Sequence, residues 1–563
     1  MLVEALEELR RGLRTVRFPL ELAGADECRG MRDRMVAQLD DYVVPRLAAL
    51  DAPLLAVVGG STGAGKSTLV NSLVGVEVAE AGVLRPTTLA PTLVVNPADE
   101  PWFSTQRILP GLPRVTGSGA AEPGSLRVVA EESVPTGLAL LDAPDIDSVV
   151  RANRELATQL LGAADLWIFL TTAARYADEV PWGFLRDARE RATALALVLD
   201  RVPAEAAEEV AADFRRLLAE NGLGETPLFT IAELGLTGEG LLPAPAVRPV
   251  REWLGGLAAD AEARADVVRR TLAGALGNLA GRVPALAEGA EAQLAAEAAL
   301  RRDAVGAYEA AMASFDDGMR DGSLLRGEVL ARWQEFIGTG ELMRSLETRI
   351  GRLRDRIVAA FTGRPLPEAR LRVALETGVE SLIRACADEA AERTVDAWAA
   401  HPAGRPLLGD DLHLARASAG LPERAAATVR DWQGYVLELV REEGASKRSA
   451  ARLASFGVNG AGLLLMLVVF AQTGGLTGVE VGIAGGTSVV SQKVLEAIFG
   501  DQAVRQLAAT ARDDLRARVE ELLVGEARRF TDRLHGLRLS PRAPDDLRAA
   551  ARAVRDSAGE VLT

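Results

Sequence analysis

The sequence predicts an α/β domain with a mostly parallel sheet, joined to a long all-α bundle or stalk that carries an apolar hairpin. Short apolar runs alternate with helical segments across residues 51–245, which is the pattern of parallel strands with crossover helices. Residues 246–450 are rich in Ala, Leu, Arg and Glu and show almost no strand pattern. Residues 451–495 contain a long stretch without charge.

Residues 1–50 are expected to form helices that pack on the stalk. Apolar residues recur there at spacings of four and three, at Leu2, Leu6, Leu9, Leu13, Val16 and Leu20. This spacing gives an apolar seam along one helix face, and an intermolecular coiled coil would need more heptads. We therefore expect the seam to dock on another helix of this chain. Pro19 limits the first helix, and a second is expected to end near Pro45.

The α/β domain is predicted over residues 51–245, from short apolar runs that are bounded by turn residues. The predicted strands are 54–58, 92–95, 126–130, 137–141, 165–170, 194–199 and 227–231. The proline-rich run 241–249 is interpreted as the boundary at which this domain ends.

A complete phosphate-loop motif, G-x-x-x-x-G-K-[ST], follows the first predicted strand. The order strand, glycine loop, helix aims backbone N–H groups and a helix N-terminus at phosphate. Lys66 is one of only three lysines among 64 Lys and Arg residues, so a compact ammonium stands where a planar guanidinium would not serve. Lys66 is expected on the β- and γ-phosphates and the Ser67 hydroxyl on Mg²⁺. The predicted nucleotide contacts are Gly60, Ser61, Thr62, Gly63, Ala64, Gly65, Lys66, Ser67 and Thr68.

Two further segments are predicted to complete the site. The apolar run 138–141 ends in Asp142, a carboxylate placed to hold Mg²⁺ directly or through water. A pair of threonines, Thr87 and Thr88, lies between the two motifs, and a threonine there can order against Mg²⁺ and the γ-phosphate. Thr88 is preferred as this metal ligand and Thr87 is the reserve. The alternative is that both threonines only begin the strand at 92–95.

Composition narrows the class of protein. A net charge of −15 and a pI of about 5.0 argue against a nucleic-acid partner that is bound through phosphate neutralisation. The two cysteines lie far apart and the three histidines are scattered, so we expect no disulfide framework and no metal beyond nucleotide-bound Mg²⁺. The N-terminus lacks the basic and apolar regions of a secretion signal. We therefore expect a cytoplasmic location.

Residues 453–490 are predicted to form an apolar hairpin. Its first arm, 453–471, holds 19 residues without charge, about 28 Å as a helix and close to a hydrocarbon core of ~30 Å. Glycines recur every fourth residue from 474 to 486, and Lys447 and Lys493 flank the segment, as expected for a re-entrant hairpin on the cytosolic side. Glu480 would cost about 2.5 kcal/mol at the bilayer centre, so a hairpin buried in the helical core is the alternative.

Two long amphipathic helices are predicted in the helical region from 3/4 spacing of apolar residues. The first covers residues 329–361. The face of the second consists of Val504, Leu507, Leu515, Val519, Leu522, Phe530, Leu534 and Leu537. This helix and the tail after it form the last expected segment, residues 496–563. Pro541 and Pro544 are expected to end the helix and to leave a frayed tail.

On these motifs the chain resembles the dynamin-like large GTPases, in particular bacterial ones. The resemblance rests on the phosphate loop, Arg85-Pro86-Thr87-Thr88, Asp142-Ala143-Pro144, helices on both sides of the P-loop domain, and a late apolar hairpin. It implies a GTPase (G) domain on a helical stalk and GTP hydrolysis with Mg²⁺. It also implies a tip that enters anionic lipid on the cytosolic face of the cell membrane, homo-oligomers formed through the G domain and stalk, and membrane remodelling.

The chain departs from the family pattern at three places. Asp145 stands where D-x-x-G has glycine, and Thr62 stands where eukaryotic dynamins carry a water-placing Gln. Pro203 occupies the place of the base-reading Asp of N-K-x-D. We therefore take Lys66, Thr88, Thr62 and Asp145 as candidate catalytic residues. Asp200 and Arg201 are candidate base contacts, Arg201 by stacking its stem on a purine, and residues 229–233 could close the base pocket.

Two other functions stay open at this point. The first is a soluble P-loop NTPase, with ATP as the alternative nucleotide, that acts as a regulatory protein-binding switch with its hairpin buried in the core. The second is a membrane scaffold that binds nucleotide without turnover, given Asp145 and Thr62. Membrane binding by the hairpin separates the dynamin-like function from the first, and turnover separates it from the second.

Overall fold

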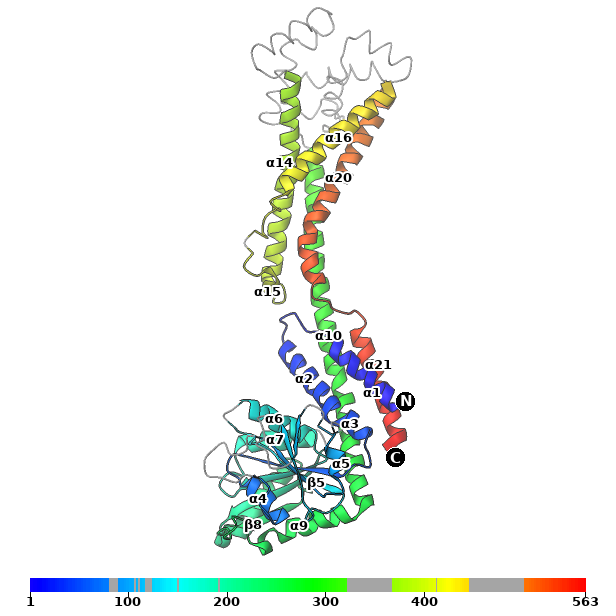
Figure 1. The fold of residues 1–563 in the computed structure, drawn as a ribbon. Helices are drawn as coiled ribbons and strands as arrows, with labels where there is room; N and C mark the ends of the chain where they lie inside the picture. Colours follow the sequence, from blue (N-terminus) through cyan, green and yellow to red (C-terminus); the bar gives the residue numbers. More distant parts are fainter. Residues whose placement is uncertain are drawn as a thin grey trace, which may run out of the picture. The chain divides into compact units, whose positions relative to one another are not determined.

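The computed structural model describes residues 1–79, 90–105, 108–109, 112–116, 124–148, 151–190, 193–320, 367–411, 413–444 and 501–562. The chain divides into two compact units (Figure 1). The sheet unit comprises Met1–Phe18, Ala23–Ala292 and Ser540–Thr563, and the helical unit comprises Pro19–Leu22 and Gln293–Leu539. The five segments expected from the sequence are a finer division, which stays a prediction.

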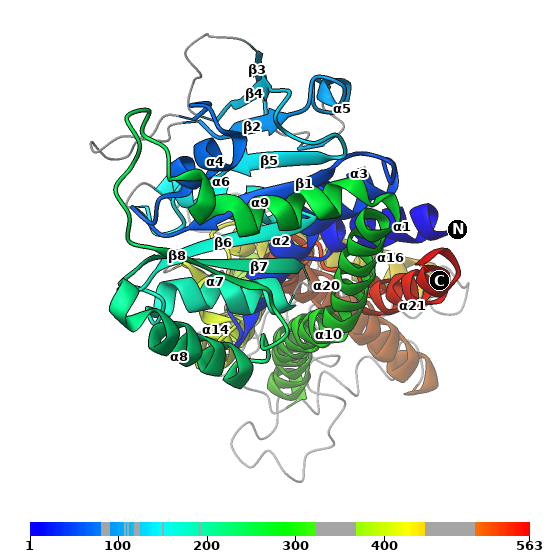
Figure 2. The same ribbon diagram turned by 90° about the horizontal axis from the view of Figure 1, so that it is seen from below.

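The sheet unit is built on one sheet whose described strands follow the order β3-β4-β2-β5-β1-β6-β7-β8 (Figure 2). The strands are β1 (Leu54–Gly60), β2 (Thr92–Val95), β3 (Arg114–Thr116), β4 (Leu126–Ala130), β5 (Leu138–Asp142), β6 (Leu166–Thr172), β7 (Ala194–Val202) and β8 (Leu228–Ala232). Among these, β2 and β5 pair antiparallel and the other neighbours pair in parallel. The predicted mostly parallel α/β sheet is confirmed. Strand β3 was missed because three residues carry no readable period.

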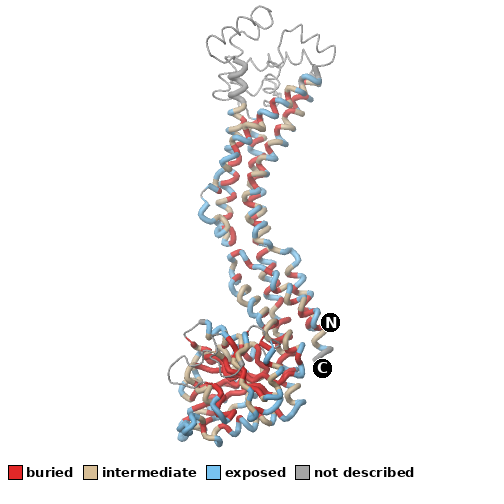
Figure 3. The backbone as a smooth tube through the Cα atoms, in the orientation of Figure 1, coloured by how far each residue is buried: buried red, intermediate tan, exposed pale blue. Residues whose placement is uncertain are grey.

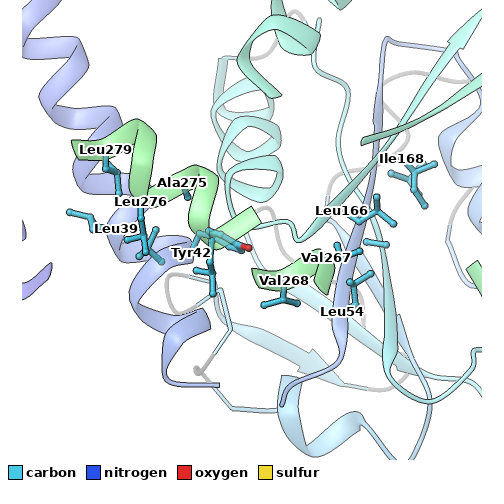
Figure 4. Packing of buried hydrophobic residues seen from close by; sticks show 14 of the residues in the cluster. Leu39, Tyr42, Leu54, Leu166, Ile168, Val267, Val268, Ala275, Leu276 and Leu279 are labelled. Carbon is cyan, nitrogen blue, oxygen red and sulfur yellow. The ribbon is translucent and has the colours of Figure 1, made fainter. Parts of the chain in front are cut away.

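Helices cover both faces of this sheet, as the alternation along β1 shows. Leu54, Ala56 and Val58 pack with α4 (Lys66–Val74), α9 (Ala244–Ala259) and the first part of α10 (Ala261–Arg320). Leu55 and Val57 pack on the other side with α6 (Arg151–Gly162), α7 (Glu179–Glu190) and α8 (Ala207–Glu220). Figure 4 shows Val267 and Val268 of α10 beside Leu54 and Leu166. A strand buried on both faces reads as a continuous apolar run, which is why these strands were predictable.

The proline-rich run 241–249 contains the start of a helix that packs on the sheet. Helix α9 begins inside it at Ala244, carries Pro245 in its first turn, and continues past Pro249. Val247 and Val250 of this helix are buried against the sheet. Proline at the first turn of a helix removes an N–H that would have no intrahelical partner, so the run starts a helix that belongs to the sheet unit.

The N-terminal seam is a helix contact within the chain. Helix α1 (Leu2–Thr15) lies beside α21 (Ala543–Leu562), so the labelled chain ends are neighbours (Figure 1). Leu9 and Leu13 of α1 and Leu547 of α21 are fully buried. The docking prediction for the seam is confirmed, and the expected frayed tail is wrong. Pro544 lies in the first turn of α21, where proline begins a helix more readily than it ends one.

The second predicted helix is a continuous helical segment that ends at Leu47, close to the end predicted near Pro45. Helix α2 (Ala25–Gln38) passes through a π-helical turn (Leu39–Val43) into α3 (Val44–Leu47), which holds Pro45 in its first turn. Leu39 and Tyr42 of the π turn pack near Ala275 and Leu276 of α10 (Figure 4). The wide turn thus presents an apolar side to the core of the sheet unit.

A buried ionic network fixes this helical segment to the start of β1. The Asp165 carboxylate accepts hydrogen bonds from the Leu55 N–H at 2.8 Å and the Tyr42 hydroxyl at 3.2 Å. Arg46 Nε lies 3.1 Å from the same carboxylate, and the side chains of Arg46 and Asp165 are 6% and 2% exposed. Burial raises the pKa of Asp165, and the charge of Arg46 and these hydrogen bonds oppose the rise.

The helical unit is all-α in the residues that the structure describes. The later part of α10 packs with α14 (Pro367–Ala400), α16 (Leu421–Gly444) and α20 (Asp501–His535), and buried residues line their shared side (Figure 3). Two buried tryptophans tie the helices together, because Trp398 Nε1 donates to the Leu300 carbonyl at 3.0 Å and Trp432 Nε1 to the Ala511 carbonyl at 2.7 Å. Of the apolar face predicted for 504–537, Val504, Leu507, Leu515, Val519, Phe530 and Leu534 are buried, and Leu522 and Leu537 are partly buried against the same core.

Several predictions from the sequence lie outside the described residues. These are the hairpin at 453–490 with its flanking Lys447 and Lys493, the helix at 329–361, and Thr87 and Thr88. Within the described ranges, no helix combines the length and apolar character needed to cross a bilayer.

Candidate nucleotide-binding site

The candidate site lies at the carboxyl edge of the sheet, where four neighbouring strands end. In the β1–β5 register Val58 pairs with Asp142, and in the β1–β6 register Gly60 pairs with Leu170. The β6–β7 register then pairs Thr172 with Asp200. The phosphate loop, Asp142 and Asp200 therefore share one edge. In open α/β sheets ligands bind at this edge, at the point where successive connections leave to opposite sides.

Two glycines give the phosphate loop its shape. A Cβ atom at Gly60 would lie 2.2 Å from the Leu170 carbonyl oxygen of β6, so no side chain fits there. Gly65 has φ +97°, and a Cβ there would lie 3.3 Å from a carboxylate oxygen of Asp200. Helix α4 begins at the next residue, Lys66. The helix N-terminus and the loop N–H groups thus lie at the sheet edge, the arrangement that binds phosphate.

Lys66 is buried and is held by two oxygen atoms. Its Nζ donates to the Ser61 carbonyl at 3.3 Å and forms an ion pair with Asp145. The Lys66 side chain is 5% exposed and that of Asp145 is 23% exposed. The carboxylate that stands where the D-x-x-G pattern has glycine therefore points at the lysine that would hold phosphate. A nucleotide would have to displace Asp145 from Lys66.

Ser67 and Asp142 form the pair expected of a magnesium site. The Ser67 hydroxyl donates to Asp142 Oδ2 at 2.6 Å. Asp142 is fully buried, and its Oδ1 atom has no hydrogen-bond partner among the described residues. Burial raises the pKa of Asp142 to about 6, although Ser67 and Lys66 both oppose the rise. A hydroxyl and a carboxylate with an unpartnered oxygen fit Mg²⁺, which takes oxygen ligands together with phosphate oxygens and water.

A metal site could also be built from side chains alone, within the part of the chain that the structure describes. No cluster of three or more His, Cys, Asp or Glu side chains is placed to hold a metal ion there.

Thr62 is bound by a carboxylate that the sequence analysis did not select. The Thr62 N–H and hydroxyl donate to Asp147 Oδ1 at 2.5 and 2.7 Å. Arg175 Nη2 donates to Asp147 Oδ2 at 3.0 Å, and Arg175 Nη1 donates to the Thr62 carbonyl at 3.3 Å. Burial would raise the pKa of Asp147, but the hydrogen bonds from Thr62 and Arg175 outweigh it and lower the pKa. Thr62 is thus enclosed between an aspartate and an arginine.

The pairing of β7 with β8 is irregular near Asp200 and Arg201, the two candidate contacts to the nucleotide base. The β7–β8 register shifts between Leu199 and Val202, which places Asp200 and Arg201 in a bulge at the strand end. Arg201 has φ +53°, and its N–H donates to Asp200 Oδ1 at 2.8 Å. Burial raises the pKa of Asp200, and the Arg201 N–H opposes the rise. Asp200 lies against the phosphate loop, and Arg201 is the more exposed of the two.

The structure thus brings together Gly60 through Thr68, Asp142, Asp145, Asp200 and Arg201, and Thr88 lies outside the described residues. Asp147 and Arg175 were missed. The signal for Asp147 was its repeat with Asp145 in Asp145-Ile146-Asp147. Arg175 gave no signal, because its place depends on the loop after β6 returning to the phosphate loop.

Comparison with known proteins returns structural likeness only. No family model and no curated protein matches the chain. The chain is similar to two solved chains of an oligomerised bacterial dynamin pair, described as providing a mechanism for long-range sensing and tethering of membranes. The identities are 11% and 10% and the TM-scores 0.42 and 0.41, over 100% of this chain and 95% of each solved chain. A TM-score below 0.5 does not establish a shared fold.

Proposed function

We propose that this protein is a dynamin-like GTPase that binds Mg²⁺ and GTP at the phosphate loop and hydrolyses GTP to GDP and phosphate. The observation that carries the proposal is the meeting of three features at one sheet edge. They are the complete phosphate loop, the Ser67–Asp142 pair, and the buried Asp142 Oδ1 without a partner among the described residues. Together they form an anion site beside a site for a hard cation.

Different residues of the site would bind the phosphates, Mg²⁺ and the attacking water. The loop N–H groups and Lys66 hold the phosphates, after Lys66 has exchanged Asp145 for phosphate oxygen. Ser67 and Asp142 hold Mg²⁺, which neutralises charge on the β- and γ-phosphates when bound. Thr62 lies at the loop position from which a side chain can contact the attacking water. Its hydroxyl donates to Asp147, so its oxygen lone pairs remain able to accept a hydrogen bond from water.

Membrane association is the second part of the proposal and rests on the sequence. The uncharged arm 453–471 and the basic residues on both sides of the hairpin favour insertion into anionic lipid from the cytosolic face. We propose that hydrolysis is coupled there to self-assembly through the G domain and stalk and to membrane remodelling. The soluble alternative keeps the nucleotide site and buries the hairpin in helical core.

A scaffold that binds nucleotide without turnover is favoured by one observation. Asp145 forms an ion pair with Lys66, so a carboxylate competes with phosphate for the lysine. If that pair persisted, hydrolysis would be slow even in a protein that binds GDP. The hydrolysis rate of the purified protein separates this candidate from a GTPase.

Binding is tested by titration calorimetry of the full chain with Mg²⁺ and GDP. We expect binding by the wild type, none by Lys66→Ala, and for Asp142→Asn a loss of the Mg²⁺-dependent part only. Arg186→Ala is the control, because Arg186 forms an exposed ion pair with Glu179 on α7. Unchanged GDP affinity in Lys66→Ala, with an unchanged melting temperature, would overturn the site assignment.

A further inference from the structure

Arg175 lies on a short loop that is held in place by backbone hydrogen bonds to β6 and by contacts of Tyr176 with α8. The loop follows β6, and the N–H groups of Arg175 and Tyr176 donate to the Thr172 carbonyl at 2.9 and 3.0 Å. The Tyr176 hydroxyl donates to Asp213 at 2.8 Å, and its ring packs on Phe214 with centroids 5.3 Å apart. The backbone of Arg175 is therefore anchored to the sheet and to α8, while its side chain extends to the phosphate loop.

The guanidinium is held in one orientation by three contacts. Nε donates to Asp178 at 2.9 Å and Nη2 to Asp147 at 3.0 Å. Nη1 donates to the neutral Thr62 carbonyl at 3.3 Å. Two carboxylates thus fix the plane of the group, and its Nη1 edge lies on the phosphate loop. The Arg175 side chain as a whole is 39% exposed, so solvent and a ligand can reach it.

Arg175 and Lys66 flank the same stretch of the loop. Lys66 Nζ donates to the Ser61 carbonyl and Arg175 Nη1 to the Thr62 carbonyl, each at 3.3 Å. These carbonyls belong to consecutive residues, so the two cations meet the loop within one peptide unit of each other. Asp145 and Asp147 leave β5 on the same segment and bind Lys66 and Thr62. The terminal phosphate of a nucleotide on Lys66 would therefore lie beside the Nη1 edge of Arg175.

We propose that Arg175 is a catalytic residue, an arginine supplied by the chain itself that stabilises the charge of the γ-phosphoryl group during its transfer to water. This proposal rests on the GTPase function proposed above. In the reaction the water oxygen bonds to the γ-phosphorus, the bond to the β,γ-bridging oxygen breaks, GDP keeps that electron pair, and the water proton passes to phosphate. Arg175 transfers no proton. It donates hydrogen bonds to the phosphoryl oxygens, a contribution worth about 10³-fold or more in kcat for arginines so placed.

Two substitutions test the role of the guanidinium. Arg175→Ala removes it, and Arg175→Lys keeps the charge without the planar fork. We expect kcat for GTP to fall about 10³-fold in Arg175→Ala and at least about tenfold in Arg175→Lys, with KM within about threefold of wild type. Arg186→Ala, which removes an exposed arginine of α7, should leave kcat unchanged.

A binding measurement separates catalysis from loop positioning. GDP with aluminium fluoride imitates the transferring phosphoryl group, so wild-type protein should bind GDP more tightly when aluminium fluoride is present. We expect Arg175→Ala to keep its GDP affinity and to lose this gain. A melting curve of each variant establishes that it is folded, and if Arg175→Ala does not fold, Arg175→Lys decides the question.

Each outcome bears on one proposal or on both. A kcat in Arg175→Ala within about threefold of wild type overturns the inference alone. A loss of GDP affinity as large as the loss of kcat also overturns it, since the residue would then only position the phosphate loop. Wild-type protein that binds GDP without hydrolysing GTP overturns the GTPase function, and the inference with it.

Discussion

At the scale of single residues, the phosphate loop is surrounded by carboxylates. Asp145 pairs with Lys66, Asp147 binds Thr62, Asp142 binds Ser67, and Asp200 lies against Gly65. Nucleotide phosphates would bring further negative charge to this edge, so we expect binding to require Mg²⁺ and to require Asp145 to leave Lys66. The dependence of nucleotide affinity on Mg²⁺, and the effect of replacing Asp145, therefore test this site most directly.

Replacing Asp145 should strengthen nucleotide binding. Asp145→Asn removes the charge that competes for Lys66 and keeps the shape, and Asp145→Gly restores the residue of the D-x-x-G pattern. We expect GDP affinity to rise about tenfold in both, equal to about 1.4 kcal/mol, and turnover to rise in Asp145→Gly. Calorimetry and a phosphate-release assay measure the two effects. A fall of kcat in both variants would instead give Asp145 a positive role, such as placing water or Mg²⁺.

The residues expected near the nucleotide base predict weak discrimination between GTP and ATP. Pro203 follows β7 where a carboxylate would read guanine, and Asp200, earlier on the same strand, lies against the phosphate loop. We expect GTP to be preferred over ATP by less than about 10³-fold, roughly 4 kcal/mol. Competition of GTP and ATP for a fluorescent GDP analogue measures the ratio. A larger ratio would show that a group other than residue 203 reads the base.

At the scale of elements, the sheet was predictable and the contacts between loops were not. Strands such as Leu54–Gly60 are buried on both faces and read as unbroken apolar runs. The phosphate loop and Asp142 were found because each is a local pattern attached to such a strand. Asp147 and Arg175 meet only because the loops after β5 and β6 converge on Thr62, and no local pattern records that approach. Helix α21 was missed because Pro541 and Pro544 were taken as the end of the preceding helix, although Pro544 lies in the first turn of α21.

The network that joins the π-helical segment to β1 should be a main contributor to stability. Arg46→Met leaves the buried Asp165 carboxylate without its cation, and breaking such a pair costs about 3–5 kcal/mol. Urea denaturation should show that loss for Arg46→Met and a smaller one for the double variant Arg46→Met, Asp165→Asn. Arg216→Ala, which removes two exposed ion pairs on α8, with Asp213 and Glu220, serves as the control. A double variant no more stable than Arg46→Met would show that the carboxylate is not the source of the loss.

The cost of removing Arg46 should depend on pH. Burial already raises the pKa of Asp165 above its ordinary value of 3.8, and loss of the cation raises it further. A carboxyl group with a raised pKa in the folded state destabilises that state increasingly as pH rises above the unfolded value. The deficit of Arg46→Met should therefore be largest near neutral pH and shrink toward pH 4. A deficit that does not change with pH would exclude the ionised Asp165 as its cause.

At the scale of the whole molecule, function depends on segments that are distant in sequence. The two ends of the chain pack together as α1 and α21 within the sheet unit, and α10 contributes to both units. Membrane binding by the hairpin predicted at 453–490 would distinguish the proposed membrane GTPase from a soluble NTPase. Its arm carries no charge over 19 residues, and the four-residue spacing of its glycines predicts close packing of two arms.

Membrane binding should require this hairpin. Wild-type protein should float with anionic liposomes, and Leu465→Asp and Gly482→Leu should weaken flotation by charging the arm or by parting the arms. Val524→Asp is the matched control, since it charges an exposed apolar residue of α20. Wild-type protein that stays at the bottom of the gradient, with and without nucleotide, would favour the soluble alternative.

The central claim is that the edge formed by β1, β5 and β6 is a GTP-hydrolysing site. The most direct test is phosphate release from Mg²⁺·GTP by the purified full chain, compared with Lys66→Ala. The geometry predicts steady release by the wild type and none above background by the variant, because Lys66 is the loop residue expected to hold the phosphates. No release by wild-type protein, or equal release by both proteins, would contradict the account.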